Sequence, residues 1–210
     1  NKIGLAGLRQ IRNAAAALRA ETKDAESGEI IVSGAIPTFE TAVATLLVAE
    51  SKEAEERGKA ASTVFQALWK AAEPLFAEGV AAPDICPVCA TPVADTAAGS
   101  AGAIREHLAK HLEELADYAA AKKTLDGAKT AATRAHTQLL AALPGLTGLL
   151  GDGEAALKAD LIDYQAGIAG WPQTVLPSSA DVVAAIIKLL ATLDQAIADI
   201  ESKQGDHTYI

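Results

Sequence analysis

The segment APDICPVCATP, residues 82–92, separates two long stretches in which mainly apolar residues recur every three or four positions. That spacing predicts a narrow apolar seam on one face of a helix. The first stretch runs from Thr38 to near Gly79, with its seam at positions 43, 46, 47, 50, 54, 57, 61, 64, 68, 72 and 75. The second runs from about Gly102 to Leu143, with its seam at positions 104, 108, 112, 115, 119, 122, 125, 128, 132, 139 and 143. At 1.5 Å per residue each helix is roughly 60 Å long, and folding back antiparallel would bury both seams at once.

The flanking regions predict a second pair of helices. A first helix with its seam from Leu5 to Thr22 stops near Ser27, and residues 29–37 hold an apolar run between glycines that predicts a short strand or extended corner. After Leu143, Pro144 and Gly145 predict the end of the second long helix. A short helical pattern covers 157–168, and Ser178 or Ser179 can cap a last helix with its seam over 183–200.

The order of these elements is palindromic, which is expected when a chain goes out along an arm and returns. We therefore predict an all-α fold: an antiparallel coiled-coil helical hairpin with an elbow and a zinc-binding tip. Residues 1–37 and 144–210 would form the outer arm helices and elbow, and residues 38–143 the inner coiled-coil hairpin, with the zinc tip at 80–111. Composition agrees, because half of the 210 residues are hydrophobic while only 4% are aromatic, which disfavours a β-sandwich or barrel.

Charge and hydropathy exclude other classes. The formal net charge of -9 disfavours a general phosphate-binding face. No apolar run approaches the roughly 18 residues of a membrane helix, and Arg9, Arg12 and Arg19 interrupt the first segment, so we expect a soluble, cytoplasmic (nucleoid-associated) protein with no membrane partner. The absence of methionine suggests a chain cut out of a longer protein.

The two cysteines, Cys86 and Cys89, predict a zinc site. A Cys-x-x-Cys turn places two thiolates where both can reach one zinc ion at about 2.3 Å. The alternatives are a redox pair or inert buried thiols, but no βαβ pattern lies nearby. Phe65, Trp69 and Phe76, near the tip, are expected to be packing residues rather than a base-stacking platform.

Two thiolates do not close a structural zinc site, and the other ligands come from this chain or from a second copy. Within the chain the candidates are His107 and His111, which lie four residues apart on one helical face, with seventeen residues between Cys89 and His107. The alternative is that both are solvated residues beside Arg105, Glu106 and Lys110.

The Cys86-Pro87-Val88-Cys89 turn and its flanking helical repeats resemble the zinc hook of the SMC-like ABC-type ATPases of double-strand-break repair and their bacterial relatives. The resemblance implies that Cys86 and Cys89 ligate zinc and that two hooks share one ion, which makes a homodimer through the zinc tip possible. The sequence departs from the family in having Ala90 where a glycine commonly follows the second cysteine, in its histidine pair, and in its short arms, which suit a diverged member.

The resemblance implies a non-catalytic coiled-coil arm that links or positions ATPase heads in DNA repair or chromosome maintenance. The sequence lacks a G-x-x-x-x-G-K-[ST] motif, so ATP binding and contact with DNA are expected only of the parent ATPase, and no small-molecule substrate is expected. Two alternatives remain: a zinc-finger-like nucleic-acid or protein binding module, and a redox enzyme using the Cys86 thiolate.

Overall fold

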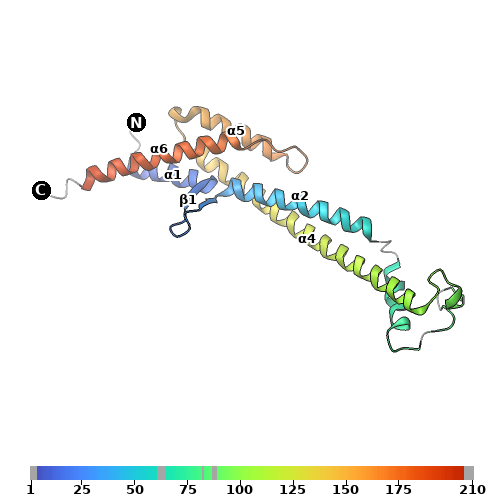
Figure 1. The fold of residues 1–210 in the computed structure, drawn as a ribbon. Coiled ribbons are helices and arrows are strands. Elements are labelled where there is room, and N and C mark those ends of the chain that lie inside the picture. The colour runs from blue at the N-terminus through green and yellow to red at the C-terminus, as the bar shows by residue number, and fades with distance from the viewer. Residues whose placement is uncertain (1–3, 61–64, 82, 87–88, 206–210) are drawn as a thin grey trace. The chain divides into compact units, whose positions relative to one another are not determined.

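The computed structural model describes residues 4–60, 65–81, 83–86 and 89–205. This part of the chain is predominantly helical, with one two-stranded sheet, which confirms the all-α prediction at that level (Figure 1). The main elements, in order, are α1 (Leu5–Leu18), β1 (Ala20–Lys23), β2 (Ile30–Ser33), α2 (Ala35–Lys59), α3 (Gln66–Ala72), α4 (Ala101–Thr147), α5 (Ala155–Ala169) and α6 (Ala180–Gly205). Short 3-10 turns occupy Glu73–Phe76, Val93–Asp95 and Asp152–Glu154. Across the described ranges, we find no helix whose length and hydropathy would suit a bilayer crossing.

The chain divides into two compact units. One consists of residues 1–44 together with 130–210, and the other of residues 45–129. Both α2 and α4 contribute residues to each unit. The sequence analysis instead placed the boundaries after residue 37 and before residue 144, because it assigned the outer segments to an arm and the inner segment to a hairpin. That division stays a prediction.

In the first unit, α1 and α6 lie side by side and run antiparallel (Figure 1). Arg9 of α1 donates to Glu201 of α6 at 2.6 Å, and Arg12 of α1 donates to Asp194 of α6 at 2.6 Å. Residue numbers therefore rise along α1 in the direction in which they fall along α6. The unit buries one apolar core, drawn from α1, α2, α4, α5 and α6. Its fully buried large side chains are Leu18, Ile36, Phe39, Leu139, Leu143, Leu146, Leu161, Ile168 and Ile186. The predicted helices at 157–168 and 183–200 are confirmed as α5 and α6.

The prediction that Pro144 ends the second long helix is wrong. Pro144 lies inside α4, which continues to Thr147. Proline removes one helical hydrogen bond, but the continued turn buries Leu146 completely in the core. The chain leaves the helix only where the Gly148 amide donates to the Pro144 carbonyl at 2.9 Å.

The expected corner between the first two helices is a β-hairpin. The apolar run 30–32 does form a strand, β2, but α1 ends at Leu18 rather than near Ser27, because residues 20–23 pair with β2 as β1. Gly34 allows this return: its φ is +116°, and a Cβ there would lie 2.5 Å from the Leu18 carbonyl oxygen.

The first long helix was predicted as continuous to about Gly79, and this is wrong. α2 ends at Lys59 and a separate helix, α3, begins at Gln66; the predicted seam positions 61 and 64 lie outside the described residues. Gly58 is the second-last residue of α2, and Ser62 and Thr63 follow in the sequence; all three are weak helix formers.

The predicted seam of the first long stretch is confirmed only in part. Along α2, Leu46 is buried as predicted, but the covered side continues through Ala49, Glu53 and Glu56, and the predicted positions 47, 50, 54 and 57 are exposed. Ala72 is also buried as predicted, whereas Leu68 and Leu75 are exposed and Phe76 is buried instead. In α4, Ala119 and Lys122 are exposed and Ala121 is buried instead, while positions 108, 115, 125, 128, 132, 139 and 143 are buried as predicted.

Candidate metal centre

A small apolar cluster in the second unit supports the cysteine loop. Ala72, Phe76, Val93 and Leu108 are buried together, and Trp69, Cys86, Ala101 and Ile104 pack against them. The prediction that the tip aromatics are packing residues is therefore confirmed for Trp69 and Phe76. Phe65 is half exposed, with its ring centroid 6.1 Å from that of Trp69, and its role stays a prediction.

Backbone hydrogen bonds hold the cysteine loop in a narrow, hairpin-like turn. Ile85 and Pro92 form an isolated antiparallel bridge, and the Val93 amide donates to the Asp84 carbonyl at 2.9 Å. Inside this bridge, the Cys86 amide donates to Thr91 at 2.7 Å and the Ala90 amide to Cys86 at 2.8 Å. Positions 87 and 88 lie outside the described residues. The turn therefore brings the backbone at Cys86 and at Ala90, which follows Cys89, together around one tight bend.

Ala90 closes this turn in a left-handed conformation, with φ of 55°. Only glycine adopts such angles without a steric cost from Cβ. Ala90 therefore has a backbone conformation that favours glycine.

The two thiols differ in environment. Cys86 is half-buried against the apolar cluster, whereas Cys89 is exposed, and neither is in a disulfide. Three hydrogen bonds lower the pKa of Cys89 below its ordinary value. In decreasing order of effect, they involve the Thr91 side chain, the Thr91 backbone and the Cys86 thiol. A lowered pKa favours the thiolate, which is the form that ligates metals.

The histidine pair lies in the first turns of α4. Ser100 caps this helix by accepting a hydrogen bond from the Ala103 amide at 3.1 Å, which is the role expected of serine at that position. His107 and His111 then share one face, with their Nε2 atoms 3.0 Å apart. The Nδ1 atom of His111 lies 3.0 Å from Glu114 Oε2.

The ring of His111 is fixed from a second side. Trp69 of α3 stacks on it with centroids 4.5 Å apart and planes inclined by only 12°. The sequence analysis assigned a role neither to Glu114 nor to this stacking. The i,i+3 spacing of Glu114 from His111 was a usable signal, because residues three apart on a helix are neighbours.

An open hollow of about 630 Å³ lies beside both cysteines and one of the histidines. Its lining includes Cys86, Cys89 and His107, together with Thr96, Ala97, Ala98, Ala103 and Ile104. Three of the four predicted ligands therefore line one hollow, and His111 lies outside its lining, in contact with His107. Two sulfur and two imidazole nitrogen donors are a set that suits zinc. Within the described ranges, no three His, Cys, Asp or Glu side chains already converge as a metal-binding group.

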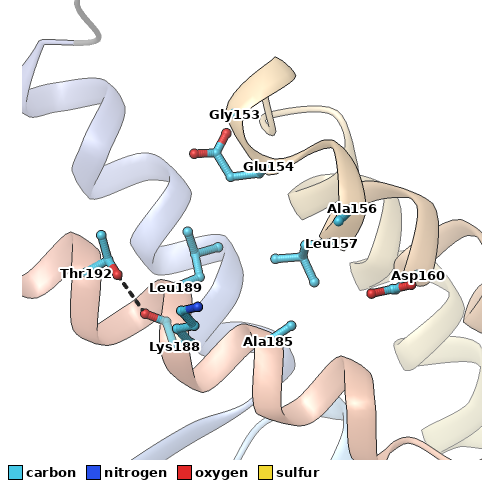
Figure 2. Close-up of a pocket in the computed structure, with 9 residues that line it drawn as sticks. All are labelled: Gly153, Glu154, Ala156, Leu157, Asp160, Ala185, Lys188, Leu189 and Thr192. Carbon is cyan, nitrogen blue, oxygen red and sulfur yellow. Dashed lines mark hydrogen bonds between the residues drawn. The ribbon is translucent and has the colours of Figure 1, made fainter.

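A second hollow, of about 350 Å³, lies between α5 and α6 in the other unit (Figure 2). Leu157 of α5 points toward Leu189 of α6 across it, and the Thr192 hydroxyl donates to the Lys188 carbonyl at 2.9 Å. Its lining combines alanine and leucine with scattered charges and includes no cysteine or histidine. This is a groove between packed helices, with no chemistry comparable to that of the cysteine loop.

Comparison of the chain with protein-family models, with curated proteins and with solved structures found no significant match.

Proposed function

We propose that the chain is a non-catalytic helical arm with a zinc-binding tip, the insert of a diverged SMC-like ATPase that acts in DNA repair or chromosome maintenance. Its work is mechanical: zinc fixes the turn, and the arm positions or links ATPase heads. ATP hydrolysis and DNA contact belong to the parent protein, which places the arm in the cytoplasm, at the nucleoid. The observation that carries the proposal is that Cys86, Cys89 and His107 line one hollow between the cysteine loop and the start of α4.

The burial along α4 supports the coiled-coil part of the proposal. Its buried side is spaced at three and four residues over Leu125, Ala128, Ala132, Ala135, Leu139, Leu143 and Leu146. A seam of this spacing is typical of a helix paired along its length with another helix. The only other long helix before the cysteine loop in the described ranges is α2, whose Phe39 ring lies 5.4 Å from the ring of His136.

The Phe39–His136 contact gives the hairpin a testable register. In an antiparallel pair, moving twelve residues forward along α2 corresponds to moving twelve back along α4, which brings Ser51 level with Thr124. Thiol-independent spin labels at 51 and 124 should therefore be closer together than labels at 51 and 138 or at 51 and 110. Each control is displaced by fourteen residues, or about 21 Å along a helix. A 51–124 distance no shorter than both controls would contradict the hairpin.

The zinc tip is tested by Cys86→Ser and Cys89→Ser, singly and together. Serine removes the thiolate with little change in volume, so bound zinc, measured by elemental mass spectrometry, should fall to background in the double variant. Far-ultraviolet circular dichroism should keep most of its helical signal, because α1, α5, α6 and most of α4 lie far along the chain from the loop. Ala94→Ser, at an exposed position in the same loop region, is the matched control and should retain zinc. Unchanged zinc content in the double serine variant would end the proposal.

A further inference from the structure

We propose that the tip completes its zinc site within one chain, with Cys86, Cys89, His107 and His111 as ligands and Glu114 as the positioning residue of His111. Each arm then ends in a closed knob, and two arms are not joined through a shared ion. This inference rests on the proposed zinc tip and names its coordination and its partner state.

The first support is the convergence of the two imidazoles. Their Nε2 atoms are 3.0 Å apart and their ring planes are nearly perpendicular, at 89°. Two nitrogens bound to one tetrahedral zinc at 2.0–2.1 Å are separated by about 3.3 Å. Small side-chain adjustments therefore suffice for both nitrogens to bind one ion, which would replace the hydrogen that they now share.

The second support is the carboxylate behind His111. A carboxylate only accepts hydrogen bonds, so the 3.0 Å contact places the hydrogen of His111 on Nδ1, and its Nε2 lone pair, which accepts from His107, is the one that a metal would bind. Metal-ligating histidines commonly have such a partner, which sets both tautomer and ring orientation. The side chains of His111 and Glu114 are only 16% and 20% exposed, and the stacked Trp69 restrains the ring further.

The third support is the packing of the cysteine loop on the same helix. Ile104 and Leu108, which flank His107 on α4, belong to the cluster that holds Cys86. Apolar packing within the chain therefore brings the cysteines and His107 to a common hollow. Two thiolates occupy two of the four positions of a tetrahedral zinc ion, and His107 and His111 supply the other two.

The decisive measurement is zinc per chain together with solution mass on the same sample, followed by replacement of zinc with cobalt(II). We expect one zinc per chain in a monomer, and cobalt absorption with thiolate charge-transfer intensity for two sulfurs. His107→Ala and His111→Ala should each weaken binding and change the ligand-field bands. Half a zinc per chain in a chelator-sensitive dimer with four-sulfur cobalt spectra would overturn the inference while leaving a zinc tip in place. No zinc in the wild-type chain would overturn the proposed function as well.

The role of Glu114 has its own test, because glutamine retains a side-chain oxygen that can accept the Nδ1 hydrogen. Glu114→Ala should weaken zinc binding by about tenfold or more, with a change in the cobalt ligand-field bands. Glu114→Gln should recover most of the affinity. Glu113→Ala, an exposed neighbour on the same helix, is the control for lost negative charge. Equal affinities and spectra for the alanine variants at 113 and 114 would overturn the positioning role.

Discussion

The imidazole of His136, in α4, donates its Nε2 hydrogen to the carbonyl oxygen of Ile168, in the last turn of α5, over 2.8 Å. The same carbonyl also accepts a hydrogen bond from the Trp171 amide at 3.0 Å, so His136 supplies a further hydrogen bond at the end of α5. The ring also packs between Phe39 and Trp171, at centroid distances of 5.4 and 5.2 Å. One side chain thus combines apolar packing with a hydrogen bond that ties α4 to α5.

Replacing His136 should separate these two contributions. His136→Phe keeps a ring between Phe39 and Trp171 but removes the donor, and we expect it to lower the free energy of unfolding by about 1 kcal/mol. His136→Ala also removes the packing and should cost about 2–3 kcal/mol. Urea unfolding followed by circular dichroism measures both. Gln138→Ala, at an exposed position of the same helix, is the control; equal stability of all three variants would contradict the role of His136.

Two glycines of the same unit should respond to alanine in opposite directions. At Gly34 the positive φ and the nearby Leu18 carbonyl leave no room for a Cβ, so Gly34→Ala should destabilise by more than about 1 kcal/mol. Gly145 lies inside α4 with no atom near the site of a Cβ, so Gly145→Ala should stabilise by about 0.5–1 kcal/mol. Thermal unfolding of both variants measures the difference, and shifts of the same sign would contradict this account.

The sequence predicted the elements whose local signals agree with one another. α4, α5 and α6 have apolar residues at helical spacing, and the cysteine loop has a specific residue spacing, whereas the C-terminal end of α4 was misplaced because Pro144 lies inside the helix. The position of the seam on α2 was less determined, because Leu46 and Leu47 are adjacent and either could begin the buried side. Only tertiary packing selects Leu46, after which Glu56 is covered at a position that composition alone would assign to solvent.

β1 and the histidine environment escaped prediction for related reasons. Only Thr22 among the residues Ala20–Lys23 favours a strand, and the segment is extended because β2 and Gly34 bring a partner to it. The stacking of Trp69 on His111 depends on α3 being a separate helix, which the apparently continuous repeat concealed. The donor types of the candidate site were thus readable from spacing, whereas their orientation depends on contacts between elements.

Glu56 should make the stability of the second unit depend on pH. Its side chain is only 7% exposed and lies 2.5 Å from Lys52 and 3.2 Å from Lys59. The hydrogen bond from Lys52, and to a smaller extent that from Lys59, lowers the pKa of Glu56 below its ordinary value of 4.5. A lowered folded-state pKa means that the stabilisation is fully present above about pH 4.5 and is lost as the pH falls through the folded-state value.

Glu56→Gln tests this pH dependence. The variant should melt at a lower temperature than wild type at pH 7, and the gap should narrow as the pH falls to about 3. Circular dichroism melts across that range measure it. Glu50→Gln, at an exposed position of the same helix, is the matched control and should follow wild type. Parallel curves for wild type and Glu56→Gln would show that the buried carboxylate does not carry the effect.

Ala90 should be replaceable by glycine with a gain in zinc affinity. A non-glycine residue in the left-handed region costs about 1 kcal/mol or more, and the φ of 55° at Ala90 accompanies the hydrogen bond from its amide to Cys86. Glycine removes that cost, but it also frees the open loop, so the net gain should be below 1 kcal/mol, or a few-fold in the zinc dissociation constant. Competition with a chromophoric chelator measures it. Ala94→Gly, which adds the same freedom at a site without positive φ, should leave the affinity unchanged or weaken it slightly. Equal affinities for the two glycine variants would mean that the backbone conformation at Ala90 does not limit zinc binding.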